Sequence, residues 1–232
     1  MSRYQRQLLV KEFGENTQSL LSKTSVLIVG AGGLGFPTAS YLAGAGVGFI
    51  GIVDNDHVEE SNLNRQLAYS ISDLGKDKAT LLAERLQRQN EQIQVEGIKL
   101  RLDDQNAQDI ISDFDVVCDC TDNLTSRLQL DKACSELKRP LVYAGVKDWE
   151  GMISVLHYKQ NIRLQDIFPV IEKINTDQNN ENSVVNTSCG VAGSLQANEV
   201  IKIITNCDSV LDGKILCFNT HRHVYRTFKL MK

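Results

Sequence analysis

The chain has 232 residues, of which 42% are hydrophobic and 23% are charged, a composition that suits one globular domain with a large buried core. Its net charge of −4 disfavours nucleic-acid binding, because phosphate backbones attract basic proteins. No apolar run reaches the roughly 18–20 residues that cross a bilayer, and the N-terminus lacks the apolar core of a signal peptide. We therefore expect a cytoplasmic protein with reduced cysteines that binds neither nucleic acid nor membranes.

The first 146 residues alternate between strand and helix patterns. An amphipathic helix over 3–14, ended by Gly14, comes first. After it, β-branched apolar runs predict buried parallel strands, and the Ala- and Leu-rich segments between them predict crossover helices. The expected strands are 24–29, 47–53, 95–100, 115–119 and 140–146, and the expected helices are 33–45, 75–90 and 123–137. This order is typical of a Rossmann-like α/β fold with a mainly parallel sheet, which binds nucleotides at the carboxyl ends of its strands.

The last third of the chain has a different pattern. A strand over 152–158 is expected to pair near the previous strand, and a polar, Asn-rich segment over 175–187 predicts a mobile loop. A helix over 190–204 follows, and strands over 214–219 and 222–230 close the chain as a hairpin. We therefore expect C-terminal antiparallel strands beside the parallel sheet, within a single domain.

A glycine-rich loop at the start of the second predicted helix indicates a nucleotide site. Gly30, Gly32, Gly33 and Gly35 follow a strand and open a helix, and Asp54 ends the next strand about 20 residues on. Glycines let the backbone approach phosphate, the helix N-terminus offers free amides, and the acid can accept from ribose hydroxyls. The alternative is a loop that only allows close packing of helix on strand. The fingerprint does not separate NAD from ATP.

The polar stretch Ser61-Asn62-Leu63-Asn64-Arg65-Gln66 favours a triphosphate ligand. It follows Asp54 closely, in a loop from the same strand end, and so brings an amide and a guanidinium near the bound nucleotide. Nicotinamide needs an apolar floor, whereas phosphate oxygens need hydrogen-bond donors.

Three further residues are candidates for contacts with phosphate or metal. Lys78 starts the next helix, where it either faces phosphate or lies solvated on the helix surface. Asp122 lies just past the strand over 115–119, a position that suits either a magnesium ligand or the N-cap of the following helix. Arg6, considered alone, is an exposed helix charge.

Together these segments resemble the ThiF/MoeB/HesA branch of the adenylate-forming superfamily of ubiquitin-activating enzymes. The resemblance covers nearly the whole chain, in an ordered series of motifs. The matching segments are 3–7, 29–35, 53–56, 61–66, 74–79, 119–123 and 193–199.

The resemblance implies an ATP-dependent adenylyltransferase. Such an enzyme activates the C-terminal carboxylate of a ubiquitin-like sulfur-carrier protein ending in Gly-Gly, in thiamine or molybdopterin pathways, and releases pyrophosphate. It also implies a homodimer and one adenylation domain over 1–232. In that domain the nucleotide-binding part is about 1–146, and the part with the acceptor site and crossover loop is about 147–232.

The resemblance implies residue roles as well. Asp54 would hold the ribose, Asp122 would bind magnesium, and Arg6 would reach the γ-phosphate from a second subunit. Catalytic roles then fall to Arg6, Arg65, Lys78 and Asp122. The implied nucleotide contacts are Gly30, Gly32, Gly33, Gly35, Asp54, Asp56, Ser61, Asn62, Leu63, Asn64, Arg65, Gln66, Lys78, Asp122 and Asn123.

The chain departs from the family pattern at its cysteines. Bacterial members carry two C-x-x-C pairs for zinc, but residues 161–168 contain no cysteine and the sequence stops at Lys232, where the second pair should follow. We therefore predict no zinc site. The family's reactive cysteine is expected near Asn179, and the nearest thiol is Cys189. This cysteine is either a buried residue at a helix start or a relocated thiol whose pKa the helix N-terminus lowers.

Three other functions stay open from the sequence. One is adenylation of a peptide C-terminus in a natural-product pathway. Another is an NAD-dependent oxidoreductase on the same fold, and the third is a non-catalytic nucleotide-binding scaffold.

Overall fold

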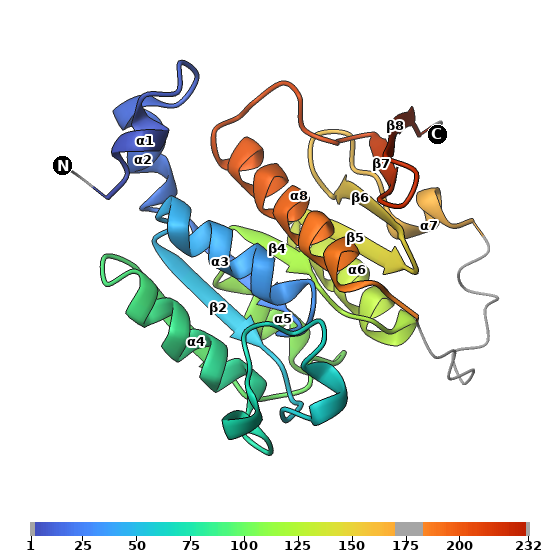
Figure 1. The fold of residues 1–232 in the computed structure, drawn as a ribbon. Coiled ribbons are helices and arrows are strands. Elements are labelled where there is room, and N and C mark those ends of the chain that lie inside the picture. The colour runs from blue at the N-terminus through green and yellow to red at the C-terminus, as the bar shows by residue number, and fades with distance from the viewer. Residues whose placement is uncertain (1–2, 170–182, 231–232) are drawn as a thin grey trace.

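The computed structural model describes residues 3–169 and 183–230, and an eight-stranded sheet forms its centre (Figure 1). The strand order is β3-β2-β1-β4-β5-β6-β7-β8. The strands are β1 (Ser25–Val29), β2 (Phe49–Val53), β3 (Gln94–Ile98), β4 (Val116–Asp119), β5 (Leu141–Lys147), β6 (Glu150–Leu156), β7 (Lys214–Asn219) and β8 (Val224–Lys229). Strands β1 to β5 pair in parallel, and β6, β7 and β8 continue the sheet antiparallel. The predicted fold class is confirmed.

Helices cover both faces of the parallel strands. The helices α3 (Gly35–Ala45), α4 (Lys78–Gln89) and α8 (Asn186–Ile204) lie on one face, and α5 (Ala107–Ser112) and α6 (Leu124–Leu137) lie on the other (Figure 1). In β1, Val26 and Ile28 enter one core, whereas Leu27 and Val29 enter the other. This alternation explains why the strand is apolar from Val26 to Val29, because neither of its faces meets water there.

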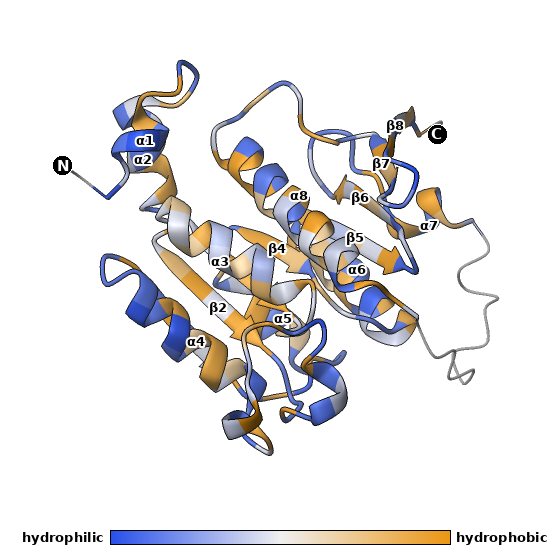
Figure 2. Cartoon of the chain, viewed as in Figure 1, coloured by the Kyte–Doolittle hydropathy of each residue, from blue (hydrophilic) through white to orange (hydrophobic). Residues whose placement is uncertain are grey.

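Hydropathy on the helices follows the same layering. Figure 2 shows α4 hydrophobic toward the sheet and hydrophilic on its outer side. Its buried residues Ala79, Leu82, Ala83 and Leu86 recur at spacings of three and four, as an amphipathic helix requires. Packing of this face, more than helix propensity, fixes where the helix lies.

The single helix predicted over 3–14 is wrong. Residues Gln5–Leu8 form a short helix, α1, and Gly14–Leu21 form a second, α2, so Gly14 begins a helix instead of ending one. The backbone of Gly14 has φ 72°, a left-handed conformation that glycine adopts without strain and that turns the chain between the two helices. Leu9, one of the apolar residues that gave the segment its amphipathic pattern, is 73% exposed in this turn.

The two N-terminal helices lie beyond the amino ends of the strands. The Gln7 side chain donates to the carbonyl of Ala45, at the end of α3, over 2.9 Å, and Asn90, just after α4, donates to the Tyr4 hydroxyl over 2.9 Å. In Figure 1 the β2 arrow points away from α1 and α2. These helices are therefore at the opposite edge of the sheet from any nucleotide site.

Several shorter elements depart from the sequence prediction. Helix α8 begins at Asn186, so residues 186–187 are helical and not part of a loop; residues 175–182 of the predicted loop lie outside the described residues. The elements not predicted are α5, α7 (Leu164–Ile167) and the 3-10 turns η1 (Glu60–Asn62) and η2 (Ile71–Asp73).

In the described part of the chain, no helix is long and apolar enough to cross a membrane. One sheet spans both predicted parts of the domain, and their division near residue 146 stays a prediction.

Candidate nucleotide-binding site

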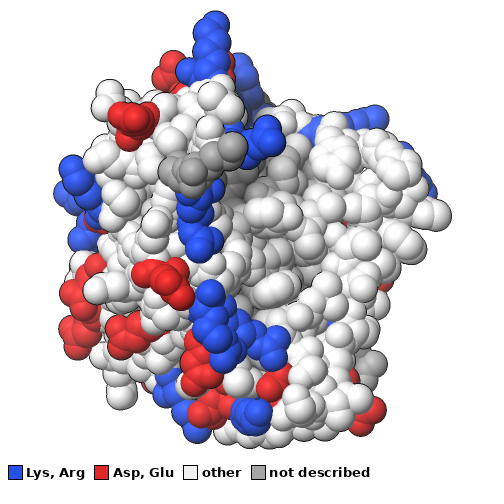
Figure 3. Space-filling view, turned by 60° about the vertical axis from the view of Figure 1, so that its left-hand side comes forward, with Lys and Arg blue, Asp and Glu red and all other residues white. Residues whose placement is uncertain are grey.

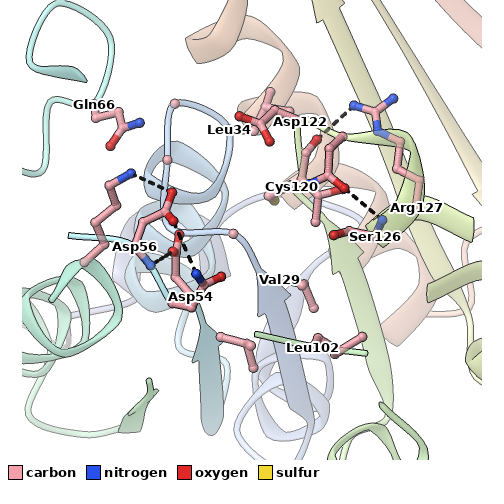
Figure 4. Close-up of a pocket in the computed structure, with 18 of the residues that line it drawn as sticks. Val29, Leu34, Asp54, Asp56, Gln66, Leu102, Cys120, Asp122, Ser126 and Arg127 are labelled. Atoms are coloured by element: carbon pink, nitrogen blue, oxygen red, sulfur yellow. Dashed lines mark hydrogen bonds and ion pairs between the residues drawn. The ribbon is translucent and has the colours of Figure 1, made fainter. Parts of the chain in front are cut away.

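A cavity of about 470 Å³ opens where β1, β2 and β4 end, at the carboxyl edge of the parallel strands. Figure 4 shows Asp54 and Asp56 on one side of it and Asp122, Ser126 and Arg127 on the other. The structure therefore brings most of the predicted residues together. Those that line the cavity are Gly30, Gly32, Gly33, Asp54, Asp56, Arg65, Gln66, Lys78, Asp122, Asn123 and Cys189.

The glycine loop is shaped by close backbone contacts. A Cβ at Gly30, whose φ is 102°, would lie 2.6 Å from the carbonyl oxygen of Cys120, and a Cβ at Gly35 would lie 1.8 Å from the carbonyl oxygen of Gly30. Gly35 is buried under the loop and does not line the cavity, whereas Gly32 and Gly33 do. The loop thus needs glycine for its own turn, and it presents backbone to whatever occupies the cavity.

Asp54 anchors this loop from β2. One carboxylate oxygen accepts from the Ala31 amide over 2.7 Å, and the other accepts from the Asp56 amide over 2.8 Å. Burial raises the pKa of Asp54 above its ordinary value, and the two amide hydrogen bonds act in the opposite direction. Each oxygen keeps a second lone pair that could accept from a ribose hydroxyl.

Lys78 is buried at the first turn of α4, with 5% of its surface exposed. The alternative of a solvated helix lysine is wrong. Its ammonium lies 3.2 Å from a carboxylate oxygen of Asp56, and this pair borders the cavity. A buried ammonium needs a counter-charge, and bound phosphate would add to the one that Asp56 provides.

Only part of the polar stretch over 61–66 lines the cavity. Arg65 and Gln66 line the cavity, and the Arg65 guanidinium is held by the Ser61 carbonyl at 2.9 Å and the Asn64 side chain at 3.0 Å. Asn62 is buried behind the wall, and Ser61, Leu63 and Asn64 also lie outside it. The side-chain oxygens of Asn62 and Gln66 are both buried without a hydrogen-bond partner among the described residues.

Asp122 and Asn123 follow β4 at the cavity edge. Asn123 is the N-cap of α6, because its side-chain oxygen accepts from the Ser126 amide over 2.9 Å. The alternative of Asp122 as the N-cap is therefore wrong. Within residues 3–169 and 183–230 no three acidic, histidine or cysteine side chains gather at a metal site, so magnesium at Asp122 would need oxygens from the nucleotide.

Arg127 lines the cavity and was not predicted from the sequence. Its guanidinium donates to the Thr121 carbonyl over 2.9 Å and to the Tyr143 hydroxyl over 2.7 Å. The available signal was its place in the first turns of a helix that begins at a strand's carboxyl end. The other residues that sequence reasoning missed are Val29, Leu34, Val53, Asn55, Leu100, Arg101, Leu102, Cys120, Thr121, Ser126, Val146 and Val184.

Arg6 does not join this cavity. It is an exposed residue of α1, which lies at the amino ends of the strands, whereas the cavity lies at their carboxyl ends. Within one chain the structure therefore separates Arg6 from the other predicted catalytic residues.

Cys189 lies in the first turn of α8 and is 3% exposed. Its sulfur would be 3.1 Å from a Cβ at Gly33, so the thiol packs against the glycine loop. Burial raises the pKa of Cys189, and the nearby charge of Arg65 offsets this only in part. The structure confirms a buried residue at a helix start, and the direction of the pKa shift is opposite to the one expected for a relocated thiol; the reactivity of Cys189 stays a prediction. Asn179 lies outside the described residues.

Comparisons with known proteins agree with this arrangement. The chain is 41% identical over 232 residues to the adenylyltransferase and sulfurtransferase MOCS3 of Caenorhabditis briggsae, covering 99% of this chain and 58% of that protein. It is 37% identical over 235 residues to the probable molybdopterin-synthase adenylyltransferase of Porphyra purpurea, covering 99% of this chain and 61% of that protein. The chain therefore spans less than two thirds of the length of these curated relatives.

Solved structures share the fold. E. coli MccB with ATP matches with a TM-score of 0.86 and 24% identity, over 100% of this chain and 72% of that chain. PaaA matches with a TM-score of 0.82 and 21% identity, over 99% of this chain and 82% of that chain. The model of the ThiF family matches residues 4–232, which is nearly the whole sequence. The chain belongs to the ThiF family.

Proposed function

We propose that the protein is an ATP-dependent adenylyltransferase that activates the C-terminal carboxylate of a ubiquitin-like sulfur-carrier protein. The observation that carries this proposal is one cavity in which Arg65 and the buried Lys78 border the glycine loop, with Asp122 at the opposite edge. The curated relatives support it, because one is named an adenylyltransferase and sulfurtransferase and the other a probable molybdopterin-synthase adenylyltransferase. The acceptor's Gly-Gly terminus is part of the same proposal.

The charges of the cavity suit this reaction. An oxygen of the acceptor carboxylate attacks the α-phosphorus of ATP, the bond to the bridging oxygen of the β-phosphate breaks, and pyrophosphate leaves. Negative charge increases on the oxygens of the α- and β-phosphates, and Arg65 and Lys78 are cations that would stabilise it there. The nucleophile is already ionised at neutral pH, so no protein base has to remove a proton.

Asp122 would hold magnesium together with phosphate oxygens. A hard divalent cation takes oxygen ligands, and the Asp122 carboxylate lies exposed at the cavity edge, where it fits such an ion. When bound, the ion would supply further neutralisation of phosphate charge. Asp54, whose two oxygens already orient the glycine loop, would accept from the ribose.

We further propose a homodimer in which Arg6 acts on the cavity of the second copy. The position of Arg6, remote from its own cavity, supports a role in trans. Figure 3 shows a hollowed surface on which charged side chains gather toward one side and below, while a wide central area carries none. Helix α3 has no charged residue and exposes 59% of Tyr41, so its surface suits contact with another protein.

We place the protein in the cytoplasm, because all six cysteines are free thiols.

Pyrophosphate exchange into ATP, measured with candidate carrier proteins, tests the proposal. We expect carrier-dependent exchange in the unchanged protein and its loss in Arg65→Ala, with the melting temperature retained. Arg88→Ala, an exposed arginine on α4 outside this cavity, is the matched control and should keep full exchange. ATP binding without exchange on any carrier would favour a nucleotide-binding scaffold. A melting temperature raised by NAD and not by ATP would favour an oxidoreductase.

A peptide acceptor is the second candidate. The fold is shared with MccB, described as a microcin C7 biosynthetic enzyme and solved in complex with N-formylated MccA. Mass spectrometry of the acyl-adenylate, formed with carriers and peptides encoded beside this gene, decides between the two acceptors.

A further inference from the structure

The turn that carries Asp122 into the cavity is held by side chains on its inner side. Asp119, the last residue of β4, accepts from the Thr121 amide over 3.0 Å and from the Thr121 hydroxyl over 2.6 Å. Arg127 donates to the carbonyl of the same threonine, Thr121, over 2.9 Å. Thr121, which directly precedes Asp122, is therefore fixed at its amide, hydroxyl and carbonyl groups.

Arg127 is itself fixed by Tyr143, a residue of the neighbouring strand β5. The guanidinium donates to the Tyr143 hydroxyl over 2.7 Å, and its central carbon lies 5.1 Å from the centre of the tyrosine ring. The Phe168 ring packs edge-on against the same tyrosine, with 5.9 Å between ring centres. Figure 4 shows Arg127 reaching toward the loop after β4, beside Asp122.

The space around the tyrosine hydroxyl allows it little freedom. A Cβ at Gly145 would lie 2.7 Å from this hydroxyl and 3.2 Å from a guanidinium nitrogen of Arg127. The tyrosine hydroxyl can occupy this space only because residue 145 is a glycine and has no Cβ. The hydroxyl in turn determines where the guanidinium lies, since a hydrogen bond to a charged donor is short and directional.

Charge also keeps Arg127 in this place. Asp119 is 1% exposed; burial raises its pKa, and Arg127 acts in the opposite direction. Burial alone lowers the pKa of Arg127, but Tyr143, Asp119 and Asp122 together raise it above its ordinary value. A buried carboxylate without a counter-charge is costly, so the always-charged guanidinium of Arg127 stabilises the buried Asp119.

We propose that Arg127, held by the Tyr143 hydroxyl, is a positioning residue that sets the Asp122 carboxylate for metal-dependent nucleotide binding. The inference rests on the proposed function, because it assigns Asp122 a magnesium ion. The connection runs from Tyr143 on β5 through Arg127 and Thr121 to Asp122. Neither Tyr143 nor Arg127 has to touch the nucleotide for this connection to act.

Calorimetric titration with ATP, in magnesium and in EDTA, tests this connection without any carrier protein. We expect Tyr143→Phe to weaken ATP binding about tenfold in magnesium and less than about twofold in EDTA, since one hydrogen bond to a charged group is lost. Phe168→Leu is the control, because it loosens packing on the same ring but leaves the hydroxyl. It should bind ATP like the unchanged protein under both conditions.

A double-mutant cycle with Asp122→Asn then separates positioning from general loosening. In the Asp122→Asn background, Tyr143→Phe should have no further effect, because the group it positions is gone. Additive losses would overturn the inference, as would equal weakening in magnesium and EDTA. Failure of the unchanged protein to bind ATP would instead reject the proposed function, and ATP binding that magnesium does not affect would reject the role of Asp122 and this inference with it.

Discussion

Two lysines near the start of α4 differ sharply in their surroundings. The Lys76 side chain is 54% exposed and pairs with Asp73, whereas the Lys78 side chain is 6% exposed and pairs with Asp56 at the cavity. Ion pairs at the surface are weak because water screens them, and a buried ammonium interacts more strongly with any anion that reaches it. The two positions therefore form a matched pair for testing whether the cavity uses a lysine.

Lys78→Ala is expected to reduce pyrophosphate exchange at least about a hundredfold, the usual effect of removing one donor that stabilises transition-state charge. Lys76→Ala should leave exchange within about twofold, because its charge is solvated and lies outside the cavity wall. Exchange rates of the two variants check this, with circular dichroism to confirm that both fold. Equal effects of the two substitutions would show that Lys78 has no special role.

The thiols of Cys207 and Cys189 differ in the direction of their pKa shifts. The Ser209 hydroxyl lies 3.2 Å from the Cys207 sulfur, and hydrogen bonding to Ser209 lowers the pKa of Cys207, whereas burial raises the pKa of Cys189. The thiolate is the reactive form, so at neutral pH the group with the lower pKa reacts first.

We therefore expect a limiting amount of iodoacetamide at pH 7 to modify Cys207 well before Cys189. Peptide mass mapping over time measures the order, and Cys207→Ser should remove the fast phase. ATP should slow the modification of Cys189 further, because this thiol packs against the glycine loop. Rapid labelling of Cys189 that ATP leaves unchanged would contradict both the burial and the position of the nucleotide.

At the scale of single elements, α3 contains two glycines with opposite requirements. A Cβ at Gly35 would lie 1.8 Å from the carbonyl oxygen of Gly30, but a Cβ at Gly44 would find its nearest atom, of Gln89, at 3.8 Å. The first contact is with backbone, which cannot move without changing the loop. The second position is an exposed helix site where alanine fits.

Gly35→Ala should therefore lower the free energy of unfolding by about 2–4 kcal/mol, the range of strongly destabilising core changes. Gly44→Ala should raise it by about 0.5–1 kcal/mol, because alanine has less backbone freedom to lose in a helix. Urea unfolding of the two variants measures both changes. A stable Gly35→Ala protein with unaltered ATP binding would show that the turn is not tightly packed.

The strands were predictable because their residues carry a local signal. In β1 and β2 the apolar runs are buried on both faces, and each boundary agrees with the predicted one within two residues. The N-terminal helices were not predictable in the same way. Their apolar spacing resembles one helix, yet the glycine at 14 starts a new one, and the packing of Gln7 on Ala45 that places α1 is a contact between residues 38 apart.

The candidate site was predictable where the chain orders it locally. The glycine loop, Asp54, Arg65 and Lys78 lie near the ends of consecutive elements, so their meeting follows from the parallel topology. Arg127 was missed because its role depends on Tyr143 from another strand, and no spacing in the sequence indicates that contact. Asn62 was predicted in the site from its motif, but it is buried and does not line the cavity.

At the scale of the whole molecule, the sheet separates two groups of predicted catalytic residues. Arg65, Lys78 and Asp122 meet at the carboxyl edge of the strands, whereas α1 holds Arg6 near the ends of α3 and α4 at the amino edge. The rigid sheet between the two edges prevents Arg6 from reaching its own cavity without unfolding α1. A catalytic Arg6 therefore requires a second copy, and this requirement can be tested by mixing variants.

Arg6→Ala and Arg65→Ala should each abolish exchange alone, yet restore it when the two chains are refolded together. In a mixed dimer the Arg6→Ala chain keeps Arg65 and receives Arg6 from its partner, so one of the two sites is complete. Random pairing makes half of the dimers mixed, which predicts recovery to about a quarter of the unchanged activity. Mixing Arg65→Ala with Lys78→Ala is the control. Both residues line the same chain's cavity, so each site of that mixed dimer lacks one of them and no recovery is expected. Absence of recovery in the first mixture, with mixed dimers confirmed by native mass spectrometry, would show that Arg6 does not act in trans.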